Sequence, residues 1–283
     1  MLKIANQFPN LSEWSLESHD WHKATQILGA IRMLTRERVP NYLELALRIE
    51  PSGLSAEQLP SGGELQLDFE RAAITCKTPQ GQESLIALEG HSQLSLLEAL
   101  LGTLQAQGQA LVENPTASDF LAALAKKGHS LNGSLQVSDT APLKVTARAG
   151  SEYIRVLNRV FTAIARHRAR LVGPQTPIVV WTEHFDLSTL WFASNNDNEQ
   201  APHMNFGFVP FDGEFEQAYL YAYAYPMPEH FEQLELPEGA QWHTSTWKGV
   251  YIPYAELEKS QDPEAFIEAS FAAIYKLLAP TLQ

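Results

Sequence analysis

Aromatic and small side chains alternate through the segment Gln217-Ala218-Tyr219-Leu220-Tyr221-Ala222-Tyr223-Ala224-Tyr225, which decides the fold of this chain. Successive residues of a β-strand point to opposite faces, so the alternation predicts a strand with all four tyrosines on one face. The opposite, small face suits close packing of a helix. The phenols either join a mixed core or line a cleft, because each hydroxyl needs water or a hydrogen-bond partner.

Further strands are predicted on both sides of this segment. Each is a run of alternating apolar and polar residues, or a run rich in β-forming residues, and turn-forming residues flank it. They cover residues 42–49, 64–69, 72–77, 84–88, 178–182, 187–192, 241–244 and 249–252, with short pieces at 135–137 and 143–147. Most consecutive strands have no helix between them, which indicates mostly antiparallel sheets.

Amphipathic helices flank these strands. In each, apolar residues recur at three- and four-residue intervals along one stripe. We expect helices over residues 20–36, 92–107 and 151–170, a short one that is capped at 118–119 and runs to 127, and a last one that Asp262 caps and Pro263 begins. The predicted fold class is therefore α+β, with mostly antiparallel sheets flanked by helices.

The order helix, strands, helix occurs twice, from about residue 18 to 108 and from 151 to 279. This order predicts an internal duplication, although few residues are identical between the halves. The expected domains are a first α+β half (1–113), a connector or insertion with a short helix (114–149) and a second α+β half (150–283), with the halves packed as one globular unit. The alternative is one irregular α+β domain whose halves resemble each other by chance.

The chain is acidic, with 33 Asp+Glu against 20 Lys+Arg and a formal net charge of −13. Such an excess opposes binding to nucleic acid or to anionic lipid. One cysteine, Cys76, cannot form an intrachain disulfide. The first residues are a poor signal peptide, and no apolar run approaches the roughly 18 residues that span a bilayer. We therefore expect a cytoplasmic protein that binds neither nucleic acid nor membrane.

The negative charge is concentrated between residues 171 and 247, where the sequence contains no Lys or Arg. The acids of this region are Glu183, Asp186, Asp197, Glu199, Asp212, Glu214, Glu216, Glu229, Glu232, Glu235 and Glu238. Their field favours a neutral or cationic small molecule as partner over one that bears phosphate. A basic helix precedes the region, and its arginines are either solvated or paired with the acidic loops; they are Arg155, Arg159, Arg166, Arg168 and Arg170.

Three residues are candidate catalytic groups: His22, Asp186 and His203. His22 shares one helix face with Gln26 and Gly29, at spacings of four and seven residues. In the functional interpretation this face is the wall of a polar pocket, where His22 exchanges protons near neutral pH. In the structural interpretation His22 is bonded to a neighbouring strand and Gly29 is a notch for helix packing.

His184-Phe185-Asp186 follows a predicted strand. If it is extended, His184 and Asp186 share a face, Phe185 enters the core, and His203 could complete a constellation in which the carboxylate orients an imidazole. Two histidines and an aspartate match a 2-His-1-carboxylate site in composition only. The favoured interpretation is a turn in which Asp186 caps the backbone and His184 faces solvent. The sequence assigns no metal and no cofactor.

Several short motifs resemble an uncharacterised bacterial family, the domain of unknown function 5996. They fall in the family's order and cover most of the chain outside residues 114–150: His22-Lys23-Ala24-Thr25-Gln26-Ile27-Leu28-Gly29, Gly53-Leu54-Ser55, Phe185-Asp186-Leu187, Asn205-Phe206-Gly207-Phe208, Tyr221-Ala222-Tyr223-Ala224-Tyr225-Pro226 and Ile252-Pro253-Tyr254. Two positions depart from the family pattern: Ala24 replaces a usual aromatic, and Asn41-Tyr42 replaces an aromatic-rich run. The resemblance implies no particular reaction.

Two functional hypotheses follow, and a metal enzyme is a third possibility. The first is a small-molecule-binding protein or an enzyme of unknown reaction, with a cleft lined by His, Asp and Tyr. Its expected ligand-binding residues are Gln26, His184, Asn205, Tyr221, Tyr223 and Tyr225. The second is a non-catalytic protein that binds another protein or a second copy of itself through an acidic, aromatic surface.

Overall fold

The computed structural model describes residues 7–127, 135, 139–215 and 217–282. Its Cα packing divides the chain into two units. The N-terminal unit comprises Leu16–Ile154 and Val180–Phe185, and the C-terminal unit comprises the residues up to Ser15, Arg155–Val179 and those from Asp186 onward. Helices flank antiparallel strands in each unit, which confirms the α+β class. The internal duplication and the boundaries of the predicted halves stay predictions.

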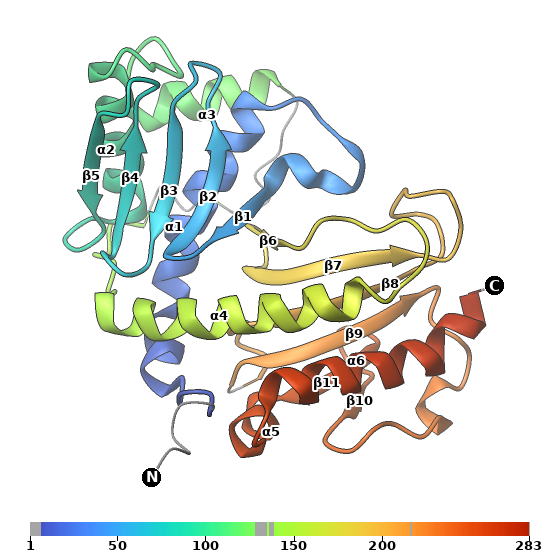
Figure 1. Cartoon of the computed structure of the whole chain (residues 1–283). Coiled ribbons are helices and arrows are strands. Elements are labelled where there is room, and N and C mark those ends of the chain that lie inside the picture. Colours follow the sequence, from blue (N-terminus) through green and yellow to red (C-terminus); the bar gives the residue numbers. More distant parts are fainter. Residues whose placement is uncertain (1–6, 128–134, 136–138, 216, 283) are drawn as a thin grey trace. The chain divides into compact units, whose positions relative to one another are not determined.

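Antiparallel strands form the sheet of the N-terminal unit in the order β6-β1-β2-β3-β4-β5. Helices α1 and α2 lie along one face of it (Figure 1), and the ring of Trp21 on α1 packs 4.7 Å from that of Phe69. The strands are β1 (Ala46–Glu50), β2 (Gly53–Gln58), β3 (Glu64–Asp68), β4 (Ala73–Lys77), β5 (Glu83–Ala87) and β6 (Val179–Trp181), and the helices are α1 (Ser12–Thr35), η1 (Pro40–Leu45), α2 (Gln93–Ala106), α3 (Ala117–Lys126) and the start of α4 (Ala147–Arg168).

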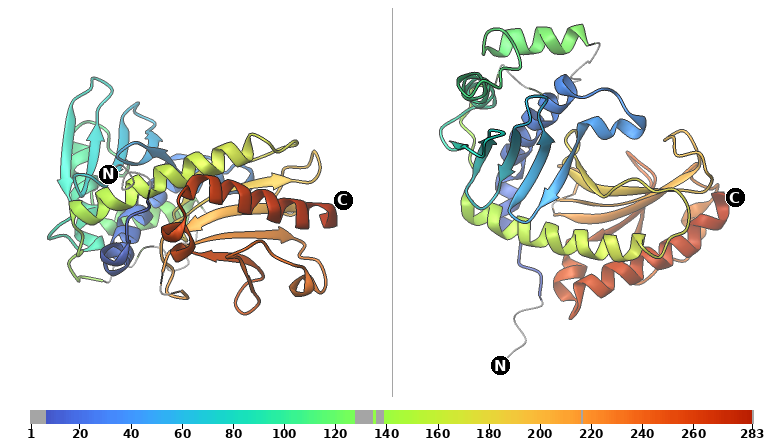
Figure 2. Two further views of the ribbon diagram at one scale, coloured as in Figure 1. Left: turned by 60° about the horizontal axis from the view of Figure 1, so that its bottom comes forward. Right: turned by 45° about the horizontal axis from the view of Figure 1, so that its top comes forward.

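The sheet of the C-terminal unit has the strand order β10-β11-β9-β8-β7. Its strands are β7 (Asp186–Phe192), β8 (His203–Val209), β9 (Tyr219–Tyr225), β10 (Gln241–His243) and β11 (Gly249–Pro253), and its other elements are η2 (Phe231–Gln233), α5 (Tyr254–Lys259), α6 (Pro263–Leu278) and η3 (Ala279–Leu282). Helices α4 and α6 cover one face of this sheet (Figures 1 and 2), where Phe206 of β8 contacts Phe271 of α6. The tyrosines of β9 lie on the other face.

Ion pairs join α4 to α6. The Arg159 guanidinium binds Glu264 through two nitrogens, at 2.5 and 2.7 Å, and Arg166 and Arg170 both reach Glu268, at 3.4 and 2.6 Å. The basic helix is therefore paired within the molecule, as one interpretation of the sequence has it. The partners of Arg159, Arg166 and Arg170 are acids of α6, and Arg168 donates to the Thr176 carbonyl.

Most predicted elements are present, but several boundaries were wrong. The first helix begins at Ser12, eight residues before the expected start. The expected strand 42–49 begins only at Ala46, because residues 40–45 form a 3₁₀ turn in which Asn41 and Tyr42 adopt positive φ. Residues 143–146 form no strand, and they lead into α4. The piece at 135–137 lies mostly outside the described residues. Strands β2 and β8 were not predicted.

The C-terminal helix is an exception to the expectation that no apolar run is long enough to span a bilayer. By length and composition, Pro263–Leu282 is apolar enough to cross a membrane. Its residues Ile267, Phe271 and Ile274 are fully buried within the unit. The core helix of a soluble protein passes the same test, so this finding is weak evidence for a membrane span.

Helix α4 carries a buried histidine, His167, on the side that packs against the sheet. The ring of His167 is 1% exposed and packs 4.7 Å from Phe206 and 5.8 Å from Phe271. Its Nε2 has no hydrogen-bond partner in the described part of the chain. Burial, with a smaller contribution from the charge of Arg170, lowers the pKa of His167 to about 4. The native state thus holds this side chain neutral.

We predict that His167 makes the protein sensitive to acid. The pKa of His167 is lower in the folded than in the unfolded state. Its contribution to the free energy of unfolding is therefore fully present above pH 6.5 and is lost as the pH falls toward 4. His167→Leu should reduce this loss by on the order of 2 kcal/mol, measured by urea unfolding at pH 7 and pH 4. His230→Asn, at an exposed position with positive φ, is the control. Equal pH dependence of His167→Leu and the wild type would contradict the prediction.

Candidate functional site

The tyrosine face of β9 divides into a covered half and an open half. Tyr219 and Tyr221 are 4% and 8% exposed, whereas Tyr225 is 45% exposed and Tyr223 is half-buried. The sequence left core and cleft as alternatives for these four residues. The structure assigns the first two to a core, against which Tyr223 packs as a partly buried ring, and leaves Tyr225 at the surface.

The covered half lies beneath an aromatic cluster. Phe215, Trp247 and Tyr251 pack against Tyr219, Tyr221 and Val209. The Phe215 ring lies 4.5 Å from that of Tyr219, whose phenol donates a hydrogen bond of 2.5 Å to Asp212. At the edge of the cluster, Glu214 accepts hydrogen bonds from Thr246 and lies 3.0 Å from His243 Nε2.

Tyr221 reaches across one strand to a buried carboxylate. Register places Tyr221 opposite Gly207 of β8, which in turn lies opposite Ser188 of β7. The phenol donates to Asp186 Oδ2 at 2.5 Å, and Asp186 is 6% exposed. A Cβ added to Gly207 would lie 2.4 Å from the Tyr221 ring, so only glycine leaves room for this crossing.

The Tyr221 phenol keeps its proton at all physiological pH values. Burial raises its pKa well above the ordinary value, and the negative charge of Asp186 raises it further. The phenol is consequently a fixed donor to the carboxylate and cannot act as a base. It can accept a hydrogen bond at the same time, because a phenol oxygen has lone pairs to spare.

Asn205 provides that hydrogen bond. Its Nδ2 donates to the phenol oxygens of Tyr221 and Tyr223, at 3.3 and 3.2 Å. Its Oδ1 is buried and has no partner among the described residues, in a side chain that is 8% exposed. Exchanging the amide oxygen and nitrogen does not remove the problem, since one polar atom still points away from both tyrosines. An unpaired buried amide group costs about 1–3 kcal/mol, so this atom is suited to bind something else.

His203 belongs to the open half, where its ring lies next to that of Tyr225. Its Nδ1 is 2.9 Å from the Ala201 carbonyl, which fixes the proton on that nitrogen and leaves Nε2 as an acceptor. Burial lowers the pKa of His203 below its usual value, against weaker opposing effects of the Ala201 carbonyl and of Glu199. The imidazole is therefore neutral at pH 7. Its ring stacks on Tyr225, with centroids 5.4 Å apart.

The remaining sequence candidates belong to the N-terminal unit. His22 Nε2 lies 3.0 Å from the Thr182 carbonyl, and its ring stacks on Phe185 at 5.4 Å. Gln26 lies 3.4 Å from His22 Nε2 and accepts a hydrogen bond from Gln93. A Cβ on Gly29 would meet Thr182 Oγ1 at 2.2 Å. These contacts are those of the structural interpretation of His22, whose pKa burial lowers to about 4.

His184 and Asp186 do not share an extended strand. Phe185 has a φ of 57° and its amide donates to the Trp181 carbonyl, so residues 182–185 form a turn. His184 is exposed, as the turn interpretation expects. Asp186, in contrast, enters β7, is 6% exposed and accepts a hydrogen bond from the Tyr221 phenol.

Two further groups bear on metal or thiol chemistry. Within the described ranges, no three His, Cys, Asp or Glu side chains lie close enough to hold a metal ion. Burial raises the pKa of the Cys76 thiol to about 12, so this cysteine is a poor nucleophile.

Sequence analysis missed the importance of Gly207, Asp212, Glu214, His243 and Trp247. The signal for Gly207 was present, because a glycine inside a β-rich run marks a close approach. The other four lie on loops or at strand ends, where the alternation of β9 gives no information about what will cover it.

These features define an α+β protein whose C-terminal unit carries a carboxylate–phenol–carboxamide network under a half-covered aromatic sheet face. The chain belongs to DUF5996, a family of unknown function, whose sequence pattern matches residues 8–283. This match confirms the resemblance that the short motifs indicate. The comparisons found no match to the chain among curated proteins or among solved structures.

We predict that Gly207→Ala breaks the network. The added methyl forces the Tyr221 ring away from Asp186, and the free energy of unfolding should fall by about 2 kcal/mol in urea denaturation. Gly102→Ala is the matched control, because a Cβ there meets nothing within 4 Å among the described residues and favours the α2 helix by about 0.5–1 kcal/mol. A Gly207→Ala protein as stable as the wild type would show that Tyr221 does not cross β8.

Proposed function

We propose that the open half of the tyrosine face binds a neutral or cationic small molecule with a flat ring and an N–H donor. The open half consists of His203, Asn205, Tyr223 and Tyr225. The observation that carries the proposal is the buried, unpaired amide oxygen of Asn205. The amide nitrogen of the same side chain binds the partly buried Tyr223, on the strand that also carries the 45% exposed Tyr225. A ligand N–H would satisfy it, and the Tyr225 face would stack on the ring.

The charge around the open half supports this ligand class. Residues 171–247 contain no Lys or Arg, and Arg159, Arg166 and Arg170, which precede this region, pair with Glu264 and Glu268. His203 is neutral and presents an acceptor. An anionic ligand therefore finds no cationic partner among these residues, whereas a ligand with N–H donors finds two acceptors, Asn205 Oδ1 and His203 Nε2.

Whether a reaction follows binding depends on His203. A neutral imidazole with a free Nε2 lone pair is suited to remove a proton from a bound ligand. The Tyr221 phenol binds both Asp186 and Asn205, so the role of the Asp186–Tyr221 pair in this proposal is to position Asn205.

The exposed ring of Tyr225 favours a second candidate, an interaction with another copy of the chain through an acidic, aromatic surface. In this case sedimentation velocity detects a dimer that Tyr225→Ser dissociates. A monomer at all concentrations would contradict the self-association.

We predict that small aromatic fragments bind at the open half, and protein NMR of a fragment screen measures this binding. Adenine, 2-aminopyridine and benzamidine should shift signals of Asn205, Tyr223 and Tyr225, and benzoate should not. Asn205→Leu should weaken binding about tenfold or more, because the amide contact is lost. Met204→Leu is the control, since this neighbouring side chain lies on the opposite face of β8. Fragments that bind elsewhere, or unchanged binding to Asn205→Leu, would contradict the proposal.

A further inference from the structure

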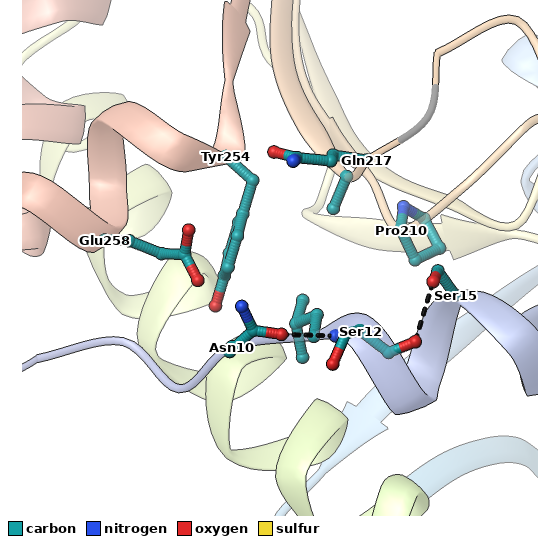
Figure 3. Close-up of a pocket in the computed structure, with 9 residues that line it drawn as sticks. Asn10, Ser12, Ser15, Pro210, Gln217, Tyr254 and Glu258 are labelled. Carbon is teal, nitrogen blue, oxygen red and sulfur yellow. Dashed lines mark hydrogen bonds between the residues drawn. The ribbon is translucent and has the colours of Figure 1, made fainter.

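A second concavity of the C-terminal unit lies where the N-terminal segment meets the start of β9 and helix α5 (Figure 3). Its volume is about 160 Å³. It shares no residue with the open half. Its lining consists of Asn10, Leu11, Ser12, Ser15, Pro210, Gln217, Ala218, Tyr254 and Glu258, and these include no Lys or Arg.

Glu258 is the charged group of this pocket. Its carboxylate has no hydrogen-bond or ion-pair partner among the described residues, and Figure 3 shows it beside the ring of Tyr254. Burial raises the pKa of Glu258, and its charge in turn raises that of the Tyr254 phenol. Other acids nearby are neutralised: Glu256 pairs with Lys259 at 2.8 Å, and Glu264 pairs with Arg159.

One wall of the pocket is held in place by contacts of Tyr254, Phe8 and Asn10. The buried Tyr254 phenol donates to the Pro9 carbonyl at 2.8 Å, and the ring stacks on Phe8 at 5.9 Å. The guanidinium of Arg159 lies 4.4 Å from the centre of the Phe8 ring. Asn10 Oδ1 accepts the Ser12 amide at 2.8 Å, which orients the carboxamide at the pocket edge. The pocket is therefore formed before any ligand arrives.

We propose that this pocket binds a small primary alkylammonium ion. The carboxylate of Glu258 accepts the ammonium group, and the hydroxyls of Ser12 and Ser15 lie in the same pocket as further acceptors. The alkyl part contacts the Tyr254 ring, Leu11 and Pro210. An ammonium group gains a charge-assisted hydrogen bond at this unpaired, partly buried carboxylate, and the pocket is large enough for a few heavy atoms.

The test is calorimetric titration of the full chain with ethylammonium chloride, with sodium chloride at the same ionic strength as reference. We expect saturable binding that Glu258→Gln weakens about tenfold or more. Glu256→Gln, on the same helix but paired with Lys259, should change the affinity less than about twofold. Acetate should not bind. Circular dichroism and thermal melting check that both variants fold.

A second measurement needs no variant. Nuclear Overhauser contacts should connect the ethyl protons of the bound ion with the ring protons of Tyr254 in the wild-type protein. The proposal is overturned if ethylammonium shows no saturable binding at concentrations up to about 20 mM. It is also overturned if Glu258→Gln and the wild type bind equally, or if the contacts involve residues outside the pocket.

Discussion

The hydrogen bond between the Tyr221 phenol and the buried Asp186 carboxylate is the interaction on which the rest of the C-terminal unit depends. A buried carboxylate is costly unless donors reach it, and this donor comes from two strands away. The phenol has to cross β8, which requires glycine at position 207. The same phenol accepts the amide of Asn205, so the orientation of this side chain follows from the crossing.

Much of the fold could be predicted because hydrophobic periodicity is local. The alternation from Gln217 to Tyr225 identified β9, and Asp262 and Pro263 identified the start of α6. Strand β8 was missed because His203, Asn205 and Gly207 weaken its β signal. Residues 40–45 were misassigned because positive φ at Tyr42 has no signature in that residue type, although Asn41 is of a type that adopts positive φ readily.

The candidate site could be predicted only as a list of residues. Tyr221, Tyr223, Asn205 and Asp186 were all named from the sequence, and the structure brings them together. The division of the tyrosine face into two halves could not be predicted, because it depends on Phe215 and Trp247 folding over Tyr219 and Tyr221 from distant loops. The acidic field was visible in the sequence. The pairing of Arg159, Arg166 and Arg170 with acids of α6 was not.

The central claim is that the unpaired amide atom of Asn205 is a ligand-binding group. The most direct measurement is a crystal structure of the protein soaked with adenine. Our account predicts a ring stacked on Tyr225 with a ligand nitrogen about 2.7–3.2 Å from the outward amide atom of Asn205. A structure in which adenine binds away from β8 and β9, while that amide atom contacts only water or protein, would contradict it.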